Sequence, residues 1–345
     1  MSRLTSHTKG LLIAFSLLIV STLTLPVIPY LWLTFSSDTA TATETQEQNP
    51  RASFWRSVRR GSSGYTAVPG REAGVYIHGN GLNWSEYRGK ILAPYGSYLM
   101  ATVLALIAIF YIVRGNIRIE KGLSGKSVLR FSVYQRTIHW FTAILFWLLA
   151  LSGLVLLYGR YVLIPLLGAK GFAITAVASK EAHNLFGPIF LLALALMIVT
   201  FIRDNLFQKG DIAWLNNGGG MFGSHASAGR FNIGEKIWFW LVCVLGLSVS
   251  VSGLALDFSI LGLDRTAMDL AHVIHSAAAI IFITISFGHI YLGTVGTQGT
   301  LQGMTSGSVD ANWVQLHHDR WVPDPQVQQE LPNSMRADMA GASRE

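Results

Sequence analysis

Long apolar runs alternate with short polar and basic stretches along most of this chain. Five such runs follow residue 93, at 94–113, 134–158, 183–202, 238–256 and 270–292. A helix of about 20 apolar residues crosses the hydrocarbon of a bilayer, because each residue adds about 1.5 Å. The pattern therefore predicts an all-α integral membrane protein.

The polar and apolar stretches divide the chain into five parts. Residues 1–34 carry basic residues and then an apolar run, which indicates a signal peptide or a first transmembrane anchor. Residues 35–92 are polar and are expected to be periplasmic. An extra transmembrane helix at 93–114 and a four-helix core at 130–293 follow, and 294–345 is expected to be a cytoplasmic tail.

The basic residues predict the orientation of the core. Nine lysines and arginines lie in the two loops at 114–130 and 203–236, whereas four lie in the loops at 159–182 and 257–269. Loops rich in Lys and Arg stay on the cytoplasmic side. The positive charge therefore has a topological role, and the net charge of +7 does not indicate a nucleic-acid partner.

Composition excludes several kinds of site. The chain is 51% hydrophobic and only 13% charged, which is too apolar for a soluble globular protein. Cys243 is the single cysteine, so the chain cannot supply a disulfide, an iron–sulfur cluster or a cysteine-based zinc site by itself. Cys243 is expected to be a packing residue in its helix.

The apolar run at 270–292 contains histidines, and ionisable residues at membrane depth are costly and usually functional. His275 and His289 lie 14 residues apart, which places them within about 40° of one helix face and about 21 Å apart along the axis. They are too far apart for one metal ion but suit two separate haems. His272 fits this face less well.

Depth predicts a partner for each of these two histidines. His183 begins a span that enters from outside, as does the helix of His275, so these two would hold an outer haem. His139 lies in the first turns of a span that enters from the cytoplasm, at the depth of His289, so these two would hold an inner haem. Bis-histidine ligation leaves no open iron position, which favours electron transfer over oxygen chemistry.

Other interpretations remain open at this point. Any one of these histidines is also compatible with a satisfied core or interfacial residue, and a non-redox transporter with a histidine-lined proton path is a rival function. Arg136, one turn before His139, is a candidate partner for a haem propionate or for lipid head groups. His317 and His318 are expected outside the membrane, against a partner, head groups or water.

Several motifs resemble a known family. They are Arg130-Phe131-Ser132, Arg136, His139-Trp140, His183-Asn184-Leu185-Phe186-Gly187, Arg230-Phe231-Asn232-Ile233-Gly234-Glu235-Lys236, the pair His275 and His289, and His317-His318-Asp319-Arg320-Trp321. Over residues 120–322 they resemble the gamma (cytochrome b) subunit of respiratory formate dehydrogenase. The exported segments 63–68 and 72–74 are similar to a longer form of that subunit. Cytochrome b subunits of nickel–iron hydrogenase and thiosulfate reductase share the four-helix plan and are the alternatives.

The resemblance implies a four-helix dihaem cytochrome b bundle with one or two extra N-terminal transmembrane helices, in the bacterial inner membrane. It implies two haem b groups on the histidine pairs above, an iron–sulfur beta subunit and a molybdenum or tungsten alpha subunit. It also implies a quinone, menaquinone or ubiquinone, beside the inner haem. Asn232 and Gly234 match the quinone-binding positions, with His289 in the same pocket. Asn232 also suits a helix N-cap.

Overall fold

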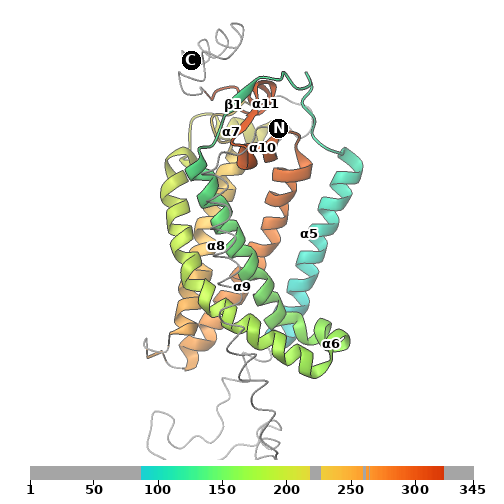
Figure 1. Ribbon diagram of the computed structural model, residues 1–345, viewed down its shortest axis with the longest axis vertical. Helices are drawn as coiled ribbons and strands as arrows, with labels where there is room; N and C mark the ends of the chain where they lie inside the picture. The colour runs from blue at the N-terminus through green and yellow to red at the C-terminus, as the bar shows by residue number, and fades with distance from the viewer. Residues whose placement is uncertain (1–86, 218–226, 259–261, 264, 322–345) are drawn as a thin grey trace, which may run out of the picture. The chain divides into compact units, whose positions relative to one another are not determined.

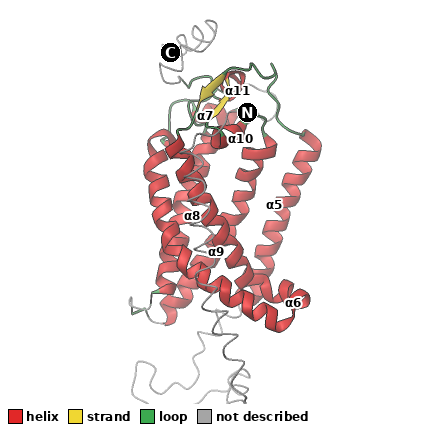
Figure 2. Ribbon diagram, in the orientation of Figure 1, coloured by secondary structure: helices red, strands yellow, loops and turns green. Residues whose placement is uncertain are grey.

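Helices make up most of the structure, a computed structural model that describes residues 87–217, 227–258, 262–263 and 265–321 (Figures 1 and 2). The predictions for residues 1–34, and for the exported segment as far as residue 86, lie outside this part of the chain. The long helices are α5 (Ala93–Arg114), α6 (Val133–Phe201), α8 (Ile233–Asp257) and α9 (Arg265–Tyr291). A π-helical turn, η2 (Arg88–Leu92), leads into α5.

By length and composition, four helices of the described part can cross a membrane. They span Arg88–Arg114, Val133–Asn205, Ile233–Asp257 and Ala267–Gly296. A membrane span must satisfy its backbone hydrogen bonds internally, and long helices do this. The predicted all-α membrane architecture is thereby confirmed.

The second of these spans contains two helices. Gly168 breaks α6, because its φ of 72° and ψ of 173° are not helical. Thr142 Oγ1 donates to the carbonyl of Ala193 at 3.3 Å, whereas a straight helix would separate these residues by about 75 Å. The chain therefore reverses between them, as the two predicted spans at 134–158 and 183–202 require.

The connection between those spans differs from the prediction. The sequence pattern predicts a loop at 159–182, but these residues are helical on both sides of Gly168. Apolar residues and alanines continue through this stretch, so only a glycine with positive φ is needed to end one helix and begin the next. His183 consequently lies well inside a helix rather than at its start.

The described chain divides into two compact units. One contains Ser152–Asn184, and the other contains Arg88–Leu151 with the residues from Leu185 onward. In the second unit, helices α8 and α9 lie side by side (Figure 1). A Cβ on Gly246 of α8 would lie 2.8 Å from Leu194 Cδ2 of α6, so glycine permits the close approach of these two helices.

Aromatic side chains fill the second unit near the start of α6 and α8. Five buried residues pack against one another there, and they are Phe131, Phe201, Phe231, Phe239 and Cys243. Cys243 is thus a packing residue, as its sequence context predicts.

Two helices begin with matching caps. Ser132 precedes α6 and Asn232 precedes α8, and each accepts a hydrogen bond from the backbone N–H three residues on. In both cases the side chain of that third residue, Gln135 or Glu235, accepts from the cap backbone in return. These capping boxes define where both helices start.

Short elements cover the end of the bundle at which α6 and α8 begin. They are β1 (Ser127–Leu129), η3 (Ile202–Asn205), α7 (Asp211–Asn216), η6 (Leu292–Gly296), α10 (Thr300–Thr305), β2 (Ser308–Asp310) and α11 (Ala311–His317). Strands β1 and β2 pair antiparallel, with Val128 opposite Val309.

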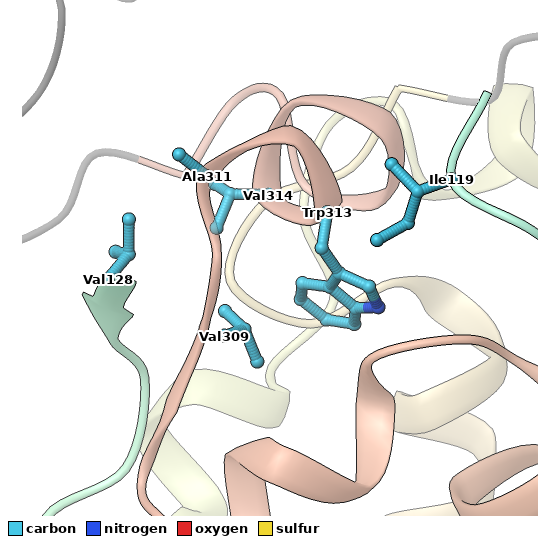
Figure 3. Packing of buried hydrophobic residues seen from close by; sticks show 6 residues of the cluster. All are labelled: Ile119, Val128, Val309, Ala311, Trp313 and Val314. Carbon is cyan, nitrogen blue, oxygen red and sulfur yellow. The ribbon is translucent and has the colours of Figure 1, made fainter. Parts of the chain in front are cut away.

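Residues 297–321, called the C-terminal cap from here on, belong to the stretch that the sequence predicts to be a polar tail. They are folded instead, and Trp313 is buried among aliphatic side chains (Figure 3). The neighbours labelled there are Ile119, Val128, Val309, Ala311 and Val314. The positions after Trp321 lie outside the described residues.

Arg130 ties the C-terminal cap to the helices. Its guanidinium donates to Glu235 Oε1 at 2.8 Å and lies 3.0 Å from His318 Nε2. It also lies over the ring of Trp313, 4.5 Å from the centroid. Burial lowers the pKa of Arg130, and the charge of Glu235 opposes this effect. The buried cation therefore depends on its carboxylate partner.

Candidate haem-binding site

His139 and His289 face each other across the second unit, from α6 and α9. Their ring centroids lie 6.3 Å apart with an interplanar angle of 56°. An imidazole nitrogen lies about 2 Å from a bound metal ion, so one metal between two imidazoles separates the ring centroids by about 6 Å. The two rings thus have the separation that a shared haem iron requires.

The surroundings of these rings also fit a prosthetic group better than a satisfied core. His139 Nδ1 is buried, and it has no hydrogen-bond partner among the described residues. His139 is half-buried and His289 is exposed, although both lie in apolar helices. A core histidine would be enclosed and would use both ring nitrogens in hydrogen bonds.

Trp238 holds the ring of His289 in place. Its indole stacks on the imidazole, with centroids 4.5 Å apart and planes 11° from parallel. The ring of Phe282 packs against the same indole, with ring centroids 6.2 Å apart. The sequence interpretation missed Trp238, although its place in the first turns of α8, at the depth expected for His289, was a usable signal.

His275 lies near the other end of α9, against the C-terminal half of α8. Its Nδ1 lies 2.9 Å from the carbonyl oxygen of Val249. A carbonyl can only accept, so Nδ1 carries the proton and the lone pair is on Nε2. This tautomer is the one that a haem-ligating histidine with a hydrogen-bonded Nδ1 uses.

His183 belongs to the unit of residues 152–184, and it is half-buried there. Its Nδ1 lies 2.8 Å from Ser152 Oγ. The predicted pairing of His183 with His275 joins residues of the two units and stays a prediction.

Asn232 and Gly234 have clear structural roles. Asn232 Oδ1 accepts from the backbone of Glu235 at 2.9 Å, so it is the N-cap of α8. A Cβ on Gly234 would lie 3.3 Å from Trp214 Cη2 and 3.1 Å from Asn232 Oδ1, so this glycine permits α7 to pack closely. Their contact with a quinone stays a prediction.

Two further polar candidates contact the C-terminal cap. Arg136 Nη1 donates to the carbonyl of Thr305, which anchors the C-terminal cap to α6. Its contact with a haem propionate or with lipid head groups stays a prediction. The sequence places His318 against a partner, head groups or water, but it is buried, with Nδ1 donating to the Gly229 carbonyl at 2.7 Å. Burial, followed by the charge of Arg130, lowers its pKa well below the usual value.

Clusters of metal ligands are absent from the described residues. No group of three or more His, Cys, Asp or Glu side chains is placed there to hold a metal ion. The apolar helices carry instead the facing imidazoles of His139 and His289, together with those of His183 and His275. A helical membrane bundle with this arrangement has the site expected of a b-type cytochrome.

Comparison with known proteins places the chain in such a class. Residues 130–307, just over half of its length, match the family described as prokaryotic cytochrome b561, and the chain belongs to this family. It is therefore a membrane b-type cytochrome, and haem b is its prosthetic group.

Three relatives of this chain are named as cytochrome b556 subunits of formate dehydrogenases. The cytochrome b556(Fdn) subunit of the nitrate-inducible formate dehydrogenase of Escherichia coli is 28% identical over 202 residues, which cover 57% of this chain and 90% of the relative. The cytochrome b556(fdo) subunit from the same organism is 27% identical over 56% of this chain and 92% of its own length. The cytochrome b556 subunit of formate dehydrogenase from Haemophilus influenzae is 25% identical, with coverages of 56% and 82%.

Proposed function

We propose that this chain is the membrane cytochrome b subunit of a formate dehydrogenase in a bacterial inner membrane, and that it passes electrons to a quinone. The observation that carries the proposal is the 6.3 Å separation of His139 and His289, on the helices of a chain whose relatives are named as such subunits. An iron–sulfur subunit would be the electron donor, and formate oxidation would occur on a separate molybdenum or tungsten subunit.

Two haem b groups would be held by four histidines. His139 and His289 would ligate the inner haem, beside the C-terminal cap, and His183 and His275 would ligate the outer haem. Bound there, haem b would supply reversible one-electron carriage, and these four histidines would hold it. The distance of about 21 Å along α9 between His275 and His289 would place the two haems at different depths.

The histidines also have the support that this role needs. At the inner pair, stacking of Trp238 orients the ring of His289. At the outer pair, the backbone carbonyl of Val249 fixes the tautomer of His275. Each of these two rings would thus present a nitrogen lone pair in a defined direction, which limits reorganisation when the iron changes charge.

The quinone would bind next to the inner haem, near the start of α8. Asn232, Gly234 and His289 are the candidate residues, and the capping role of Asn232 Oδ1 leaves its amide Nδ2 as the donor to a quinone carbonyl. Formate yields carbon dioxide, one proton and two electrons. The quinone takes up those two electrons and two protons from the cytoplasm, so the reaction contributes to the membrane potential.

Purification of the intact complex tests this function. The expected result is copurification with an iron–sulfur subunit and a molybdenum or tungsten subunit, together with formate-dependent quinone reduction. The variant N232A should raise the KM for quinone and leave formate oxidation with an artificial acceptor unchanged. A nickel–iron hydrogenase as the copurified partner would contradict formate as the donor substrate, and would support the alternative cytochrome b subunit.

A further inference from the structure

The tripeptide Ser-Gly-Leu occurs twice in this chain, at 152–154 in α6 and at 252–254 in α8. In both places the serine lies within hydrogen-bond distance of an imidazole, and a Cβ added to the glycine would contact the same ring. The two imidazoles are those of His183 and His275, the ligands assigned above to the outer haem. The same Ser-Gly sequence therefore lies next to both of these histidines.

The first Ser-Gly pair, Ser152 and Gly153, lies with His183 within the unit of residues 152–184. Ser152 Oγ is 2.8 Å from His183 Nδ1, which is a short hydrogen bond. A Cβ on Gly153 would lie 3.4 Å from His183 Cε1. The serine thus bonds the ring, and a Cβ at Gly153 would be in ordinary van der Waals contact with the same ring.

The second Ser-Gly pair, Ser252 and Gly253, belongs to α8 and faces His275 of α9. Ser252 Oγ is 3.3 Å from His275 Nδ1 and donates its own proton to the carbonyl of Ser248 at 2.5 Å. Its lone pair therefore faces the N–H of His275, beside the carbonyl of Val249. A Cβ on Gly253 would lie 3.1 Å from His275 Cε1, which is closer than an ordinary contact.

Hydroxyl side chains in these helices commonly bond within their own helix, and Ser252 also does so through its bond to Ser248. Serine and threonine in apolar helices usually donate to a carbonyl of their own helix one turn earlier. Ser276, Thr284 and Ser286 of α9 show this bond. The contact of Ser152 and Ser252 with an imidazole on another turn or helix is an additional interaction that helix stability alone does not require.

A hydrogen bond to Nδ1–H has two effects on a ligating histidine. It fixes the tautomer and the ring orientation, and it raises the basicity of Nε2. We propose that Ser152 and Ser252 are positioning residues for His183 and His275, and that each Ser-Gly pair sets the orientation and the donor strength of one outer-haem ligand. This inference rests on the ligation assigned under Proposed function.

The two Ser-Gly pairs differ in geometry, so their serine variants and their glycine variants should differ in opposite orders. Ser152 Oγ lies 2.8 Å from His183 Nδ1, whereas Ser252 Oγ lies 3.3 Å from His275 Nδ1, so S252A, which removes the longer bond, should have a smaller effect than S152A. For the glycines the order reverses. G253A forces a contact of 3.1 Å on its histidine, whereas G153A adds an ordinary contact of 3.4 Å.

Redox titration of the haem absorbance in the purified complex tests the inference. S152A should shift the midpoint potential of the outer haem in the positive direction, because a weaker donor stabilises ferric iron less. S252A should shift it less, S152T should retain the original value, and the inner haem should not change in any of them. The matched control is S250A, since Ser250 is buried in α8 and its Oγ has no hydrogen-bond partner among the described residues.

Two comparisons separate failure of this inference from failure of the proposed function. H183A and H275A must both remove the outer haem, and if either keeps both haems the ligation itself is wrong. If both lose it while S152A keeps the wild-type potential, the inference is overturned. Equal shifts in S152A and S152T, or a shift in S250A, would also overturn it, because the hydroxyl would then have no special role.

Discussion

The contact of Glu235 with Arg130 gives the sharpest test of how the C-terminal cap is held. The Arg130 side chain is only 3% exposed, whereas that of Glu235 is 32% exposed, and their charged atoms lie 2.8 Å apart. Glu235→Ala would leave a buried guanidinium without its carboxylate. It would also remove the capping-box acceptor for the backbone of Asn232.

The magnitude follows from these two losses. Removing one partner of a buried ion pair costs about 3–5 kcal/mol, but a partner that is one-third exposed leaves room for water, so about 2 kcal/mol is expected here. Loss of the capping-box acceptor at the start of α8 adds roughly 1 kcal/mol to this cost. At about 1.4 kcal/mol per tenfold change, the total corresponds to an increase of roughly a hundredfold in local opening.

Hydrogen exchange measured by mass spectrometry on the detergent-solubilised complex reports this opening. The peptide 311–321 contains backbone N–H groups that bond from the C-terminal cap to the rest of the unit, such as that of Arg320 to the carbonyl of Ala228. E235A should exchange there about a hundredfold faster than the wild type. E235Q, which retains the capping acceptor but not the charge, should fall between them.

A surface ion pair provides the matched control. Lys180 and Glu181 lie 3.1 Å apart, but both side chains are more than half exposed, so E181A should change exchange less than about threefold. If E235A also changed exchange in the C-terminal cap less than about threefold, the buried Arg130 would not depend on Glu235 and the ion pair would not hold the cap.

Two other predictions concern the C-terminal cap and the bundle. Burial, and then the charge of Arg130, lowers the pKa of His318 well below its usual value of 6.5. As the pH falls, His318 therefore takes up a proton in the unfolded chain before it does so in the folded protein, so stability should be full above pH 6.5 and should fall at lower pH. The same exchange experiment, repeated in a pH series, measures this loss. G246A should cost about 1–3 kcal/mol in thermal or denaturant unfolding, because its Cβ would lie 2.8 Å from Leu194. G293A is the control, with nothing within 4 Å of its Cβ, and an equal loss in both variants would contradict the importance of this close packing.

The sequence predicts the long helices well because a membrane restricts the possibilities. The apolar run at 270–292 corresponds to α9 (Arg265–Tyr291), since about 20 apolar residues in lipid have few alternatives to a helix. The ends of helices are less predictable. Gly168 alone decides that residues 159–182 form two helical arms rather than a loop, and glycine is too frequent in this chain for one position to stand out.

The C-terminal cap could not be predicted because its contacts are far apart in the sequence. Arg130 and His318 lie 188 positions apart and meet in a buried contact, and no local pattern indicates such a partner. The histidines behave differently, because depth in a bilayer restricts which of them can meet. The facing pair of His139 and His289 is what their shared depth leads us to expect, whereas the support from Trp238 depends on side-chain packing that periodicity does not specify.

The proposed electron path depends on which histidines share a haem, and this can be measured directly. Redox titration of the purified complex should resolve two b-type components. H139A and H289A should each remove one and the same component, and H183A and H275A should each remove the other. Loss of the same component from H139A and H275A, or two haems retained in H289A, would contradict the pairing and with it the proposed path.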